Sequence, residues 1–400
     1  MLLTTPFPKL RAKYACAVSL LICFAQYTWA DPTPIPCTTP IPQPTPPVPV
    51  DLNIVAHQDD DILFMNPDIL NAVVAGHRQV TVFITGGNTD EDGQAYALER
   101  EEGAIAGYSK LLQLADAKKG CPNHFDDFMD VFQGDSQYPA GCPSPTPTDT
   151  MHCFACVELA CELSTAGDAR GQRGQMKIGS RTLNVATIGD GPDGPRVLLI
   201  FLRVQTPCEL WGNNECPTRV DLHELLTSPN HKLQIRSAFN QPGYTRQQLI
   251  TQLVQILQLV QPDVLRTQDT ADGHNVDFPH EEMITNNGCN ADPNITFTNP
   301  QFYDHSDHVA GARFAREALK VYDKLLNVKL PTYSIYMGYN LEWNQEATNP
   351  PRVTTADFCL KKSIFFRYGL HDSALTQNSF DCFYYWYIGY QQSVSVTPLP

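Results

Sequence analysis

The amino-acid sequence predicts an α/β fold with a Rossmann-like, mostly parallel sheet that is flanked by helices. Short apolar runs of strand length alternate along the chain with segments of helical periodicity, as in parallel α/β folds. Several of these runs end in polar residues or glycines, namely His57 to Asp61, Gly86-Gly87-Asn88, Arg203 and Arg266-Thr267. Because ligands in open α/β sheets bind beyond the carboxyl ends of the strands, these ends predict a pocket at one edge of the sheet.

The first part of the expected domain supplies two strands and two helices. Residues 52–56 form an apolar strand, and residues 61–74 follow as a helix. Residues 79–85 are a second strand, closed by Gly86 and Gly87. Residues 95–115 place Ala, Leu, Ile and Tyr at helical spacing, which predicts one long helix.

Residues 117–195 interrupt this alternation. They carry five cysteines with several prolines and glycines and have weak periodicity, so we expect a disulfide-rich insertion. Residues 268–304 are rich in Asp and Asn and are expected to be irregular. The other expected elements are a strand at 196–203, a helix at 244–260 between Thr245 and Pro262, a short strand at Val264-Leu265, a helix at 306–327, and late strands at 332–337 and 383–389.

The N-terminal region predicts export. Residues 1–30 have the three parts of a secretory signal peptide: a basic start, an apolar core and a small-residue cleavage site. The alternative is a signal anchor, although the apolar core is short for a membrane span. Residues 31–50 form a proline-rich linker, and residues 51–400 form the domain. We therefore expect a secreted or periplasmic protein with no stable transmembrane segment after cleavage.

Charge and cysteine content narrow the function classes. The formal net charge is -15, and residues 1–30 hold three cations and no acid, so the remainder carries -18. That balance argues against nucleic acid or an anionic membrane surface as the partner. Eleven cysteines follow residue 30, and in an exported chain we expect most of them to form disulfides. Cys153, Cys156 and Cys161 have a spacing that a zinc knuckle would also use.

Two clusters of metal-binding residue types stand out. The strand at 52–56 runs directly into His57 and the adjacent acids Asp59, Asp60 and Asp61, whose mutual repulsion a divalent cation would relieve. The second cluster, Asp304-His305-Ser306-Asp307-His308, begins a helix, where Asp304 or Ser306 can serve as the cap. Together they offer the nitrogen and oxygen ligands that a catalytic zinc uses, with a fourth position open to water. Taken singly, each cluster has a plain structural alternative as a helix cap or a satisfied histidine.

These motifs resemble those of the LmbE/PIG-L family of zinc-dependent N-deacetylases, which includes the GlcNAc-PI de-N-acetylases. Ala56-His57-Gln58-Asp59-Asp60-Asp61 is similar to the family's Ala-His-Pro-Asp-Asp-Glu motif, and His305-Ser306-Asp307-His308 matches its His-x-Asp-His motif. The resemblance spans about residues 50–325 apart from the insertion and is closest to an exported subgroup with His-Gln-Asp-Asp-Asp. Gln58 in place of Pro and Asp61 in place of Glu are departures that remove no expected ligand.

The resemblance implies a role for each residue of the two motifs. His57, Asp60 and His308 would bind Zn²⁺ or another divalent metal. Asp59 would be the general base for the attacking water. His305, oriented by Asp307, would stabilise the oxyanion or protonate the leaving amine.

Two arginines are candidates for substrate binding. The resemblance places Arg100 against the substrate, whereas the residues around it also allow a surface Arg among Glu99, Glu101 and Glu102. Arg203 ends a strand near the expected pocket, where it could hold a phosphate or a sugar hydroxyl or pair with a local acid.

The function that the resemblance implies is an exported metal-dependent amidohydrolase. Its partner would be an N-acetylated amino sugar or glycoconjugate, from which it would remove the acetyl group. One alternative is the same site acting on another sugar-linked amide. Two others are a catalytically silent carbohydrate-binding protein and a disulfide-rich structural surface protein, although the second leaves both motifs unexplained.

Overall fold

A computed structural model gives the fold. It describes residues 48–87, 94–120, 171–191, 194–205, 222–227, 234–235, 242–269, 304–326, 328–338, 353, 355–375, 388, 391 and 393–396. The signal peptide, most of the linker, residues 121–170 of the expected insertion, nearly all of the expected irregular segment at 268–304 and most of the expected strand at 383–389 lie outside these residues. Of the eleven cysteines after residue 30, only Cys359 lies in a described element, so the expected disulfides also lie outside them.

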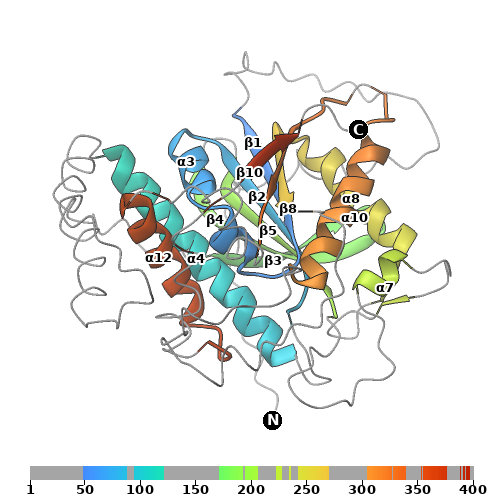
Figure 1. Ribbon diagram of the computed structural model, residues 1–400, viewed down its shortest axis with the longest axis horizontal. Helices are drawn as coiled ribbons and strands as arrows, with labels where there is room; N and C mark the ends of the chain where they lie inside the picture. Colours follow the sequence, from blue (N-terminus) through green and yellow to red (C-terminus); the bar gives the residue numbers. More distant parts are fainter. Residues whose placement is uncertain are drawn as a thin grey trace, which may run out of the picture.

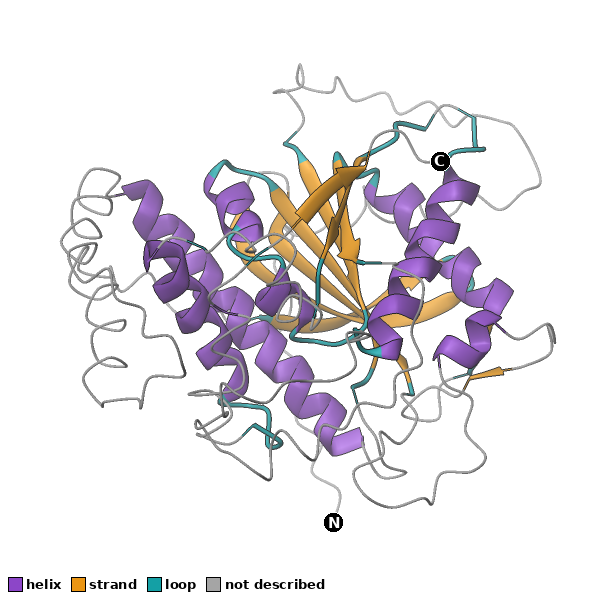
Figure 2. Cartoon of the chain, in the orientation of Figure 1, coloured by secondary structure: helices purple, strands orange, loops and turns teal. Residues whose placement is uncertain are grey.

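An eight-stranded sheet runs through the centre of the molecule (Figures 1 and 2). Its order is β10-β9-β8-β1-β2-β5-β4-β3, and the five strands from β9 to β5 are mutually parallel. The strands are β1 (Val50–Val55), β2 (Arg78–Thr85), β3 (Gln172–Ile178), β4 (Arg181–Gly191), β5 (Gly194–Val204), β8 (Val264–Gln268), β9 (Thr332–Tyr336) and β10 (Ser393–Val396). A separate two-stranded sheet pairs β6 (Gln234–Ile235) with β7 (Tyr244–Thr245).

Helices cover both faces of the large sheet, which confirms the predicted α/β class (Figure 1). One face packs against α2 (Asp60–Phe64), α3 (Asp68–Val74), α4 (Gln94–Gly120) and α12 (Thr355–Gly369). The other packs against α7 (Leu222–Thr227), α8 (Arg246–Val260) and α10 (Ser306–Tyr322). Among the described helices, none is both long and apolar enough to cross a membrane.

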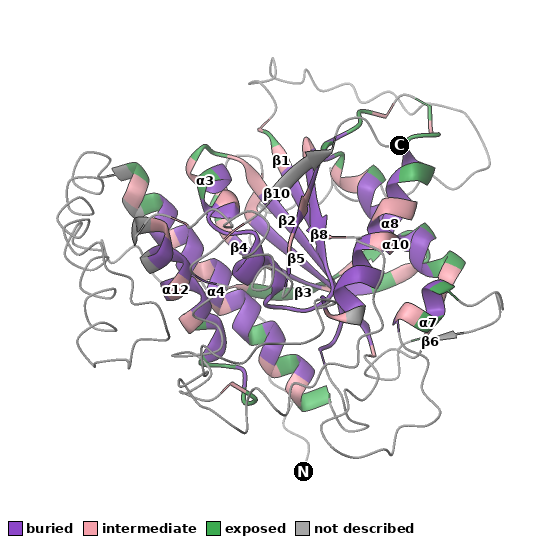
Figure 3. Ribbon diagram, in the orientation of Figure 1, coloured by how far each residue is buried: buried purple, intermediate pink, exposed green. Residues whose placement is uncertain are grey.

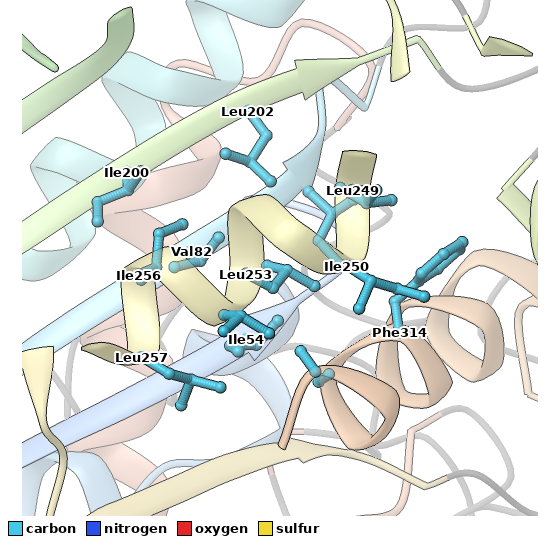
Figure 4. Packing of buried hydrophobic residues seen from close by; sticks show 14 of the residues in the cluster. Ile54, Val82, Ile200, Leu202, Leu249, Ile250, Leu253, Ile256, Leu257 and Phe314 are labelled. Carbon is cyan, nitrogen blue, oxygen red and sulfur yellow. The ribbon is translucent and has the colours of Figure 1, made fainter. Parts of the chain in front are cut away.

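The central strands are buried on both faces, so each contributes to two cores (Figure 3). In β1, Val55 packs toward α4 while the adjacent Ile54 packs toward α8, because successive side chains of a strand point to opposite faces. Figure 4 shows the second core, in which apolar side chains of α8, including Leu253, lie over β1, β2 and β5. This double burial explains the continuous apolar runs that predicted the strands.

The N-terminus of α8 forms as its sequence predicts. The Thr245 hydroxyl accepts a hydrogen bond from the Gln248 amide, and the Gln248 side chain accepts one from the Thr245 amide, which forms a capping box. Gln261 ends the helix in a left-handed conformation, directly before Pro262. The helix expected at 306–327 ends earlier, at Tyr322.

Several elements differ from the sequence prediction, and three of the differences bear on the main sheet and its helices. The expected helix at 61–74 is two short helices, α2 and α3, separated at Pro67, where the missing amide and fixed φ interrupt a helix. Residues 172–191, assigned to the insertion, instead form β3 and β4 of the main sheet. Helix α12 was not predicted at all.

Candidate metal centre

The two sequence clusters meet where the order of the sheet reverses. From β1 the chain proceeds to β2 on one side and later returns to β8 on the other side, and both strands are parallel to β1. The carboxyl ends of β1 and β8 therefore flank a switch point, the usual ligand position in open α/β sheets. His57 follows β1 there, and α10, which packs on both strands, brings in His308.

Three donor atoms at this point form a compact triangle. His57 Nδ1 lies 3.2 Å from His308 Nε2, and His308 Nε2 lies 3.0 Å from Asp60 Oδ1. The third side, from His57 Nδ1 to Asp60 Oδ1, measures 3.5 Å. The backbone amide of His57 donates to Asp60 Oδ2 at 2.7 Å, so the local turn fixes the carboxylate toward the histidines.

The electrostatics of the triangle favour charged groups. Burial lowers the pKa of His57, but the carboxylates of Asp60 and Asp307 outweigh it and raise this pKa to about 9. Burial likewise opposes charge on His308, yet Asp60 and Asp304 raise its pKa well above the usual value. Burial raises the pKa of Asp60, and the two histidines more than reverse that effect. A metal would therefore displace protons from these histidines when it binds.

His305 completes the set of histidines that could hold a metal ion. One donor atom from each of His57, His305 and His308 lies within 4.8 Å of the others. His305 is also the N-cap of α10, where its Nδ1 accepts a hydrogen bond from the Asp307 amide at 3.1 Å. The cap is therefore His305, not Ser306 or Asp304 as the sequence suggested. Because Nδ1 is an acceptor there, the neutral ring carries its proton on Nε2.

In two of these histidines, a carboxylate lies beside the ring nitrogen that points away from the triangle. Asp304 Oδ1 lies 2.7 Å from His308 Nδ1 and also accepts from the His305 amide at 2.9 Å. Asp307 Oδ2 lies 3.4 Å from His57 Nε2, so this carboxylate faces His57, while the backbone amide of Asp307 contacts His305 Nδ1. The support from Asp304 was not anticipated, since its position next to His305 suggested only a cap.

The acids on either side of Asp60 have separate partners on α4. Asp59 Oδ1 accepts a hydrogen bond from Arg100 Nη2, and Asp61 Oδ2 accepts one from the Tyr108 hydroxyl. Burial raises the pKa of Asp59 despite the opposing charge of Arg100, and it raises the pKa of Asp61 to about 7. The three adjacent acids are thus divided among an arginine, two histidines and a tyrosine, which limits their mutual repulsion.

Two residues next to the triangle fix the loop that carries it. The Gln58 amide donates to the Thr85 carbonyl at 3.1 Å, which ties the loop to the end of β2. This bond gives Gln58 a role that Pro cannot fill, because Pro has no side-chain donor. Gly87 has a φ of 63°, and its carbonyl oxygen accepts a hydrogen bond from Arg100 Nη1 at 3.3 Å.

The expected substrate residues are both held by acids. Arg100 is buried and contacts Asp59 directly. Arg203 donates to both oxygens of Glu101 at 2.5 and 2.7 Å, and Glu101 also accepts from Arg173 at 2.6 Å. Arg203 therefore forms a local ion pair, which was the alternative that the sequence left open.

No model of a known protein family matches the chain, and no curated protein sequence matches it. Among solved structures the chain is similar to GalB, the 4-carboxy-2-hydroxymuconate hydratase from Pseudomonas putida KT2440, at 10% sequence identity and a TM-score of 0.36. The match covers 84% of this chain and 83% of the hydratase. A similarity this low carries no argument about activity.

Proposed function

We propose that this protein is a zinc-dependent amidohydrolase that removes the acetyl group from an N-acetylated amino sugar or glycoconjugate. The observation that carries the proposal is the buried triangle of His57 Nδ1, His308 Nε2 and Asp60 Oδ1, with separations of 3.0 to 3.5 Å. Ligand atoms about 2.1 Å from a tetrahedral zinc lie about 3.4 Å apart. The separations therefore fit one ion at the centre of the three atoms.

The surroundings of the triangle fit the same assignment. Metal-binding histidines usually donate their second ring nitrogen to a carboxylate, and Asp304 and Asp307 are placed to accept from His308 and His57. When bound, a divalent cation would polarise a substrate carbonyl and make water more acidic. Two histidines and one carboxylate are a donor set that catalytic zinc uses, although other divalent metals accept it as well.

Asp59 is suited to act as the general base. It adjoins Asp60, and one of its oxygens is held by Arg100. Within the described residues its second oxygen has no hydrogen bond, so that oxygen is available to accept a proton from water. The raised pKa of Asp59 also makes it a stronger proton acceptor than an ordinary Asp carboxylate.

His305 is suited to act as a donor and not as a ligand. The helix cap occupies its Nδ1 and leaves the proton of the neutral ring on Nε2. An N–H donor beside the triangle would stabilise negative charge on a carbonyl oxygen or deliver a proton to a leaving amine. This separates the proposed ligands from the wider histidine cluster, which includes His305.

The substrate class and the location rest on sequence. The His-Gln-Asp-Asp-Asp and His-x-Asp-His motifs resemble those of enzymes that deacetylate amino sugars, and residues 1–30 resemble a signal peptide. We therefore propose a secreted or periplasmic location and an N-acetyl sugar as the substrate.

Metal binding and acetate release test the proposal separately. After treatment with a chelator, the full chain should take up about one zinc per molecule, and His57→Ala and His308→Ala should each abolish this uptake. Asp116→Asn, which removes an exposed partner of Arg196, is the control and should bind zinc normally. Undiminished zinc uptake by both histidine variants would show that the ligand assignment is wrong.

Acetate release would be measured across a panel of N-acetyl sugars with added zinc. Asp59→Asn should retain zinc and lose activity by about 100-fold or more, the range for removal of a general base. A zinc-loaded protein that releases no acetate from any member would exclude this substrate class and favour another sugar amide or a binding role.

A further inference from the structure

We propose that Tyr368, in the last turn of α12, and Asp372, which follows this helix, are positioning residues that hold Arg100 in a single-point contact with Asp59. This inference rests on the proposed role of Asp59 as the general base. An arginine beside a carboxylate usually forms two parallel hydrogen bonds that occupy both carboxylate oxygens. Such a pair would remove the free oxygen that a base requires.

Every side-chain nitrogen of Arg100 has a separate partner. Nη2 donates to Asp59 Oδ1, Nη1 donates to the Gly87 carbonyl at 3.3 Å, and Nε donates to the Tyr368 hydroxyl at 2.7 Å. With Nε and Nη1 engaged elsewhere, the guanidinium offers Asp59 only one nitrogen. The second oxygen of Asp59 stays available for that reason.

Asp372 fixes the far side of this arrangement. Its Oδ2 accepts from the Tyr368 hydroxyl at 2.7 Å and lies 3.5 Å from Arg100 Nε. Its Oδ1 accepts from the Tyr96 hydroxyl at 2.9 Å and from the Ala374 amide at 3.1 Å. A buried carboxylate with this many donors is rigid and negative, so it draws Arg100 away from a bidentate contact with Asp59.

The packing of α4 against α12 shows a second sign of this arrangement. A Cβ atom on Gly103 would lie 2.8 Å from the ring and from the carbonyl oxygen of Tyr368. Only glycine therefore allows Tyr368 to approach α4 closely enough to reach Arg100, one turn away. The close approach at Gly103 and the hydrogen bond from Arg100 Nε therefore both place Tyr368 beside Arg100.

Two substitutions that preserve shape test the inference, Tyr368→Phe and Asp372→Asn, with Asp116→Asn as the matched surface control. In zinc-loaded protein, acetate release from N-acetylglucosamine should fall in kcat by about 10- to 100-fold for both variants, because a small displacement of a catalytic group has effects of that size. The KM and the zinc content should stay within about twofold of the wild type, since neither residue is placed among the metal ligands. A kcat within twofold of the wild type in both variants would overturn the inference.

A second readout does not depend on the reaction. In arginine-labelled protein, the Nε–H signal of Arg100, identified by its loss in Arg100→Lys, should exchange slowly with water in the wild type and the control. We expect exchange at least about tenfold faster in Tyr368→Phe and Asp372→Asn, because the buried acceptors of this proton are weakened or removed. Unchanged exchange in both variants would overturn the inference. If wild-type protein released no acetate, the proposed function would fail while this measurement would still decide whether the arrangement exists.

Discussion

Nδ1 of His308 lies 2.7 Å from Oδ1 of Asp304, and the opposite nitrogen of the same ring faces Asp60. A carboxylate in this position orients the ring and makes the ligand nitrogen more basic. A Cβ on Gly338 would overlap Asp304, so the segment that follows β9 leaves room for this side chain.

We therefore predict that Asp304→Ala lowers zinc affinity by about 10- to 100-fold, the usual effect of losing such a partner. Asp304→Asn should lose less, because its amide oxygen still accepts from Nδ1. Competition with a chromophoric chelator measures both affinities, with Asp323→Asn at the exposed end of α10 as control. Equal affinity in Asp304→Ala and the wild type would contradict the role of Asp304.

The Tyr108 hydroxyl of α4 joins Asp61, at the start of α2, to Thr81 in β2. It donates to Asp61 and lies 2.6 Å from Thr81 Oγ1 in a fully buried position. Tyr108→Phe should lower the free energy of unfolding by about 1 to 3 kcal/mol, because the buried Asp61 carboxylate and Thr81 each lose one hydrogen-bond partner.

Tyr322→Phe is the matched control for that change. Tyr322 is equally buried, but within the described residues its hydroxyl has no hydrogen-bond partner. We expect a change of less than about 0.5 kcal/mol or a small gain in stability. Urea unfolding of both variants measures the difference, and equal losses would show that burial of any tyrosine hydroxyl explains the effect.

Substitutions at Gly87 and Gly76 distinguish the effect of backbone strain from the effect of steric overlap. Both have positive φ, 63° and 94°, but a Cβ on Gly87 would overlap Arg100 whereas one on Gly76 meets nothing within 4 Å. Gly76→Ala should destabilise the protein by about 1 kcal/mol through its backbone alone. Gly87→Ala should lose more stability and also reduce acetate release while retaining zinc. Thermal unfolding and the activity assay test this, and identical behaviour of the two variants would refute it.

Lys361 should make stability depend on pH in the alkaline range. It is buried in α12, and burial lowers its pKa to about 7 against the opposing effect of Asp68 and Asp357. Between that value and the ordinary 10.5, the unfolded chain binds a proton that the folded protein does not. The free energy of unfolding therefore rises with pH across this window and is flat below it.

Lys361→Met should remove this dependence. From pH 7 to pH 9 the wild type should gain about 2 kcal/mol over the variant, at about 1.4 kcal/mol for each full pH unit. Urea unfolding at several pH values measures the gain, and groups that titrate in both proteins cancel in the comparison. Parallel curves for the two proteins would show that Lys361 keeps an ordinary pKa.

The sequence predicted the central strands because they are buried on both faces and therefore read as continuous apolar runs. It could not predict β3, an edge strand in which most residues are exposed and polar. Helix α12 was missed for a related reason. It buries Lys361 and Ser363 among its apolar residues, which obscures the helical pattern.

The candidate site likewise contains residues that the sequence could predict and residues that it could not. Local spacing in the sequence indicates the residues within the two motifs, such as His57 and His308. Tyr108 and Asp372 reach the site only through contacts between elements distant in sequence, so no local pattern indicates them. The supporting role of Asp304 is also invisible locally, because it depends on which way the ring of His308 turns.

The two halves of the triangle are 251 residues apart in the chain. During synthesis the ribosome completes β1 and its loop long before α10 emerges, and a cation that arrives early meets only His57 and Asp60. Helix α10 lies in the connection between the parallel strands β8 and β9, so its docking accompanies the growth of the sheet on that side. The proposed metal ion can therefore meet all three of its ligands only after synthesis has passed His308, when most of the chain has been made.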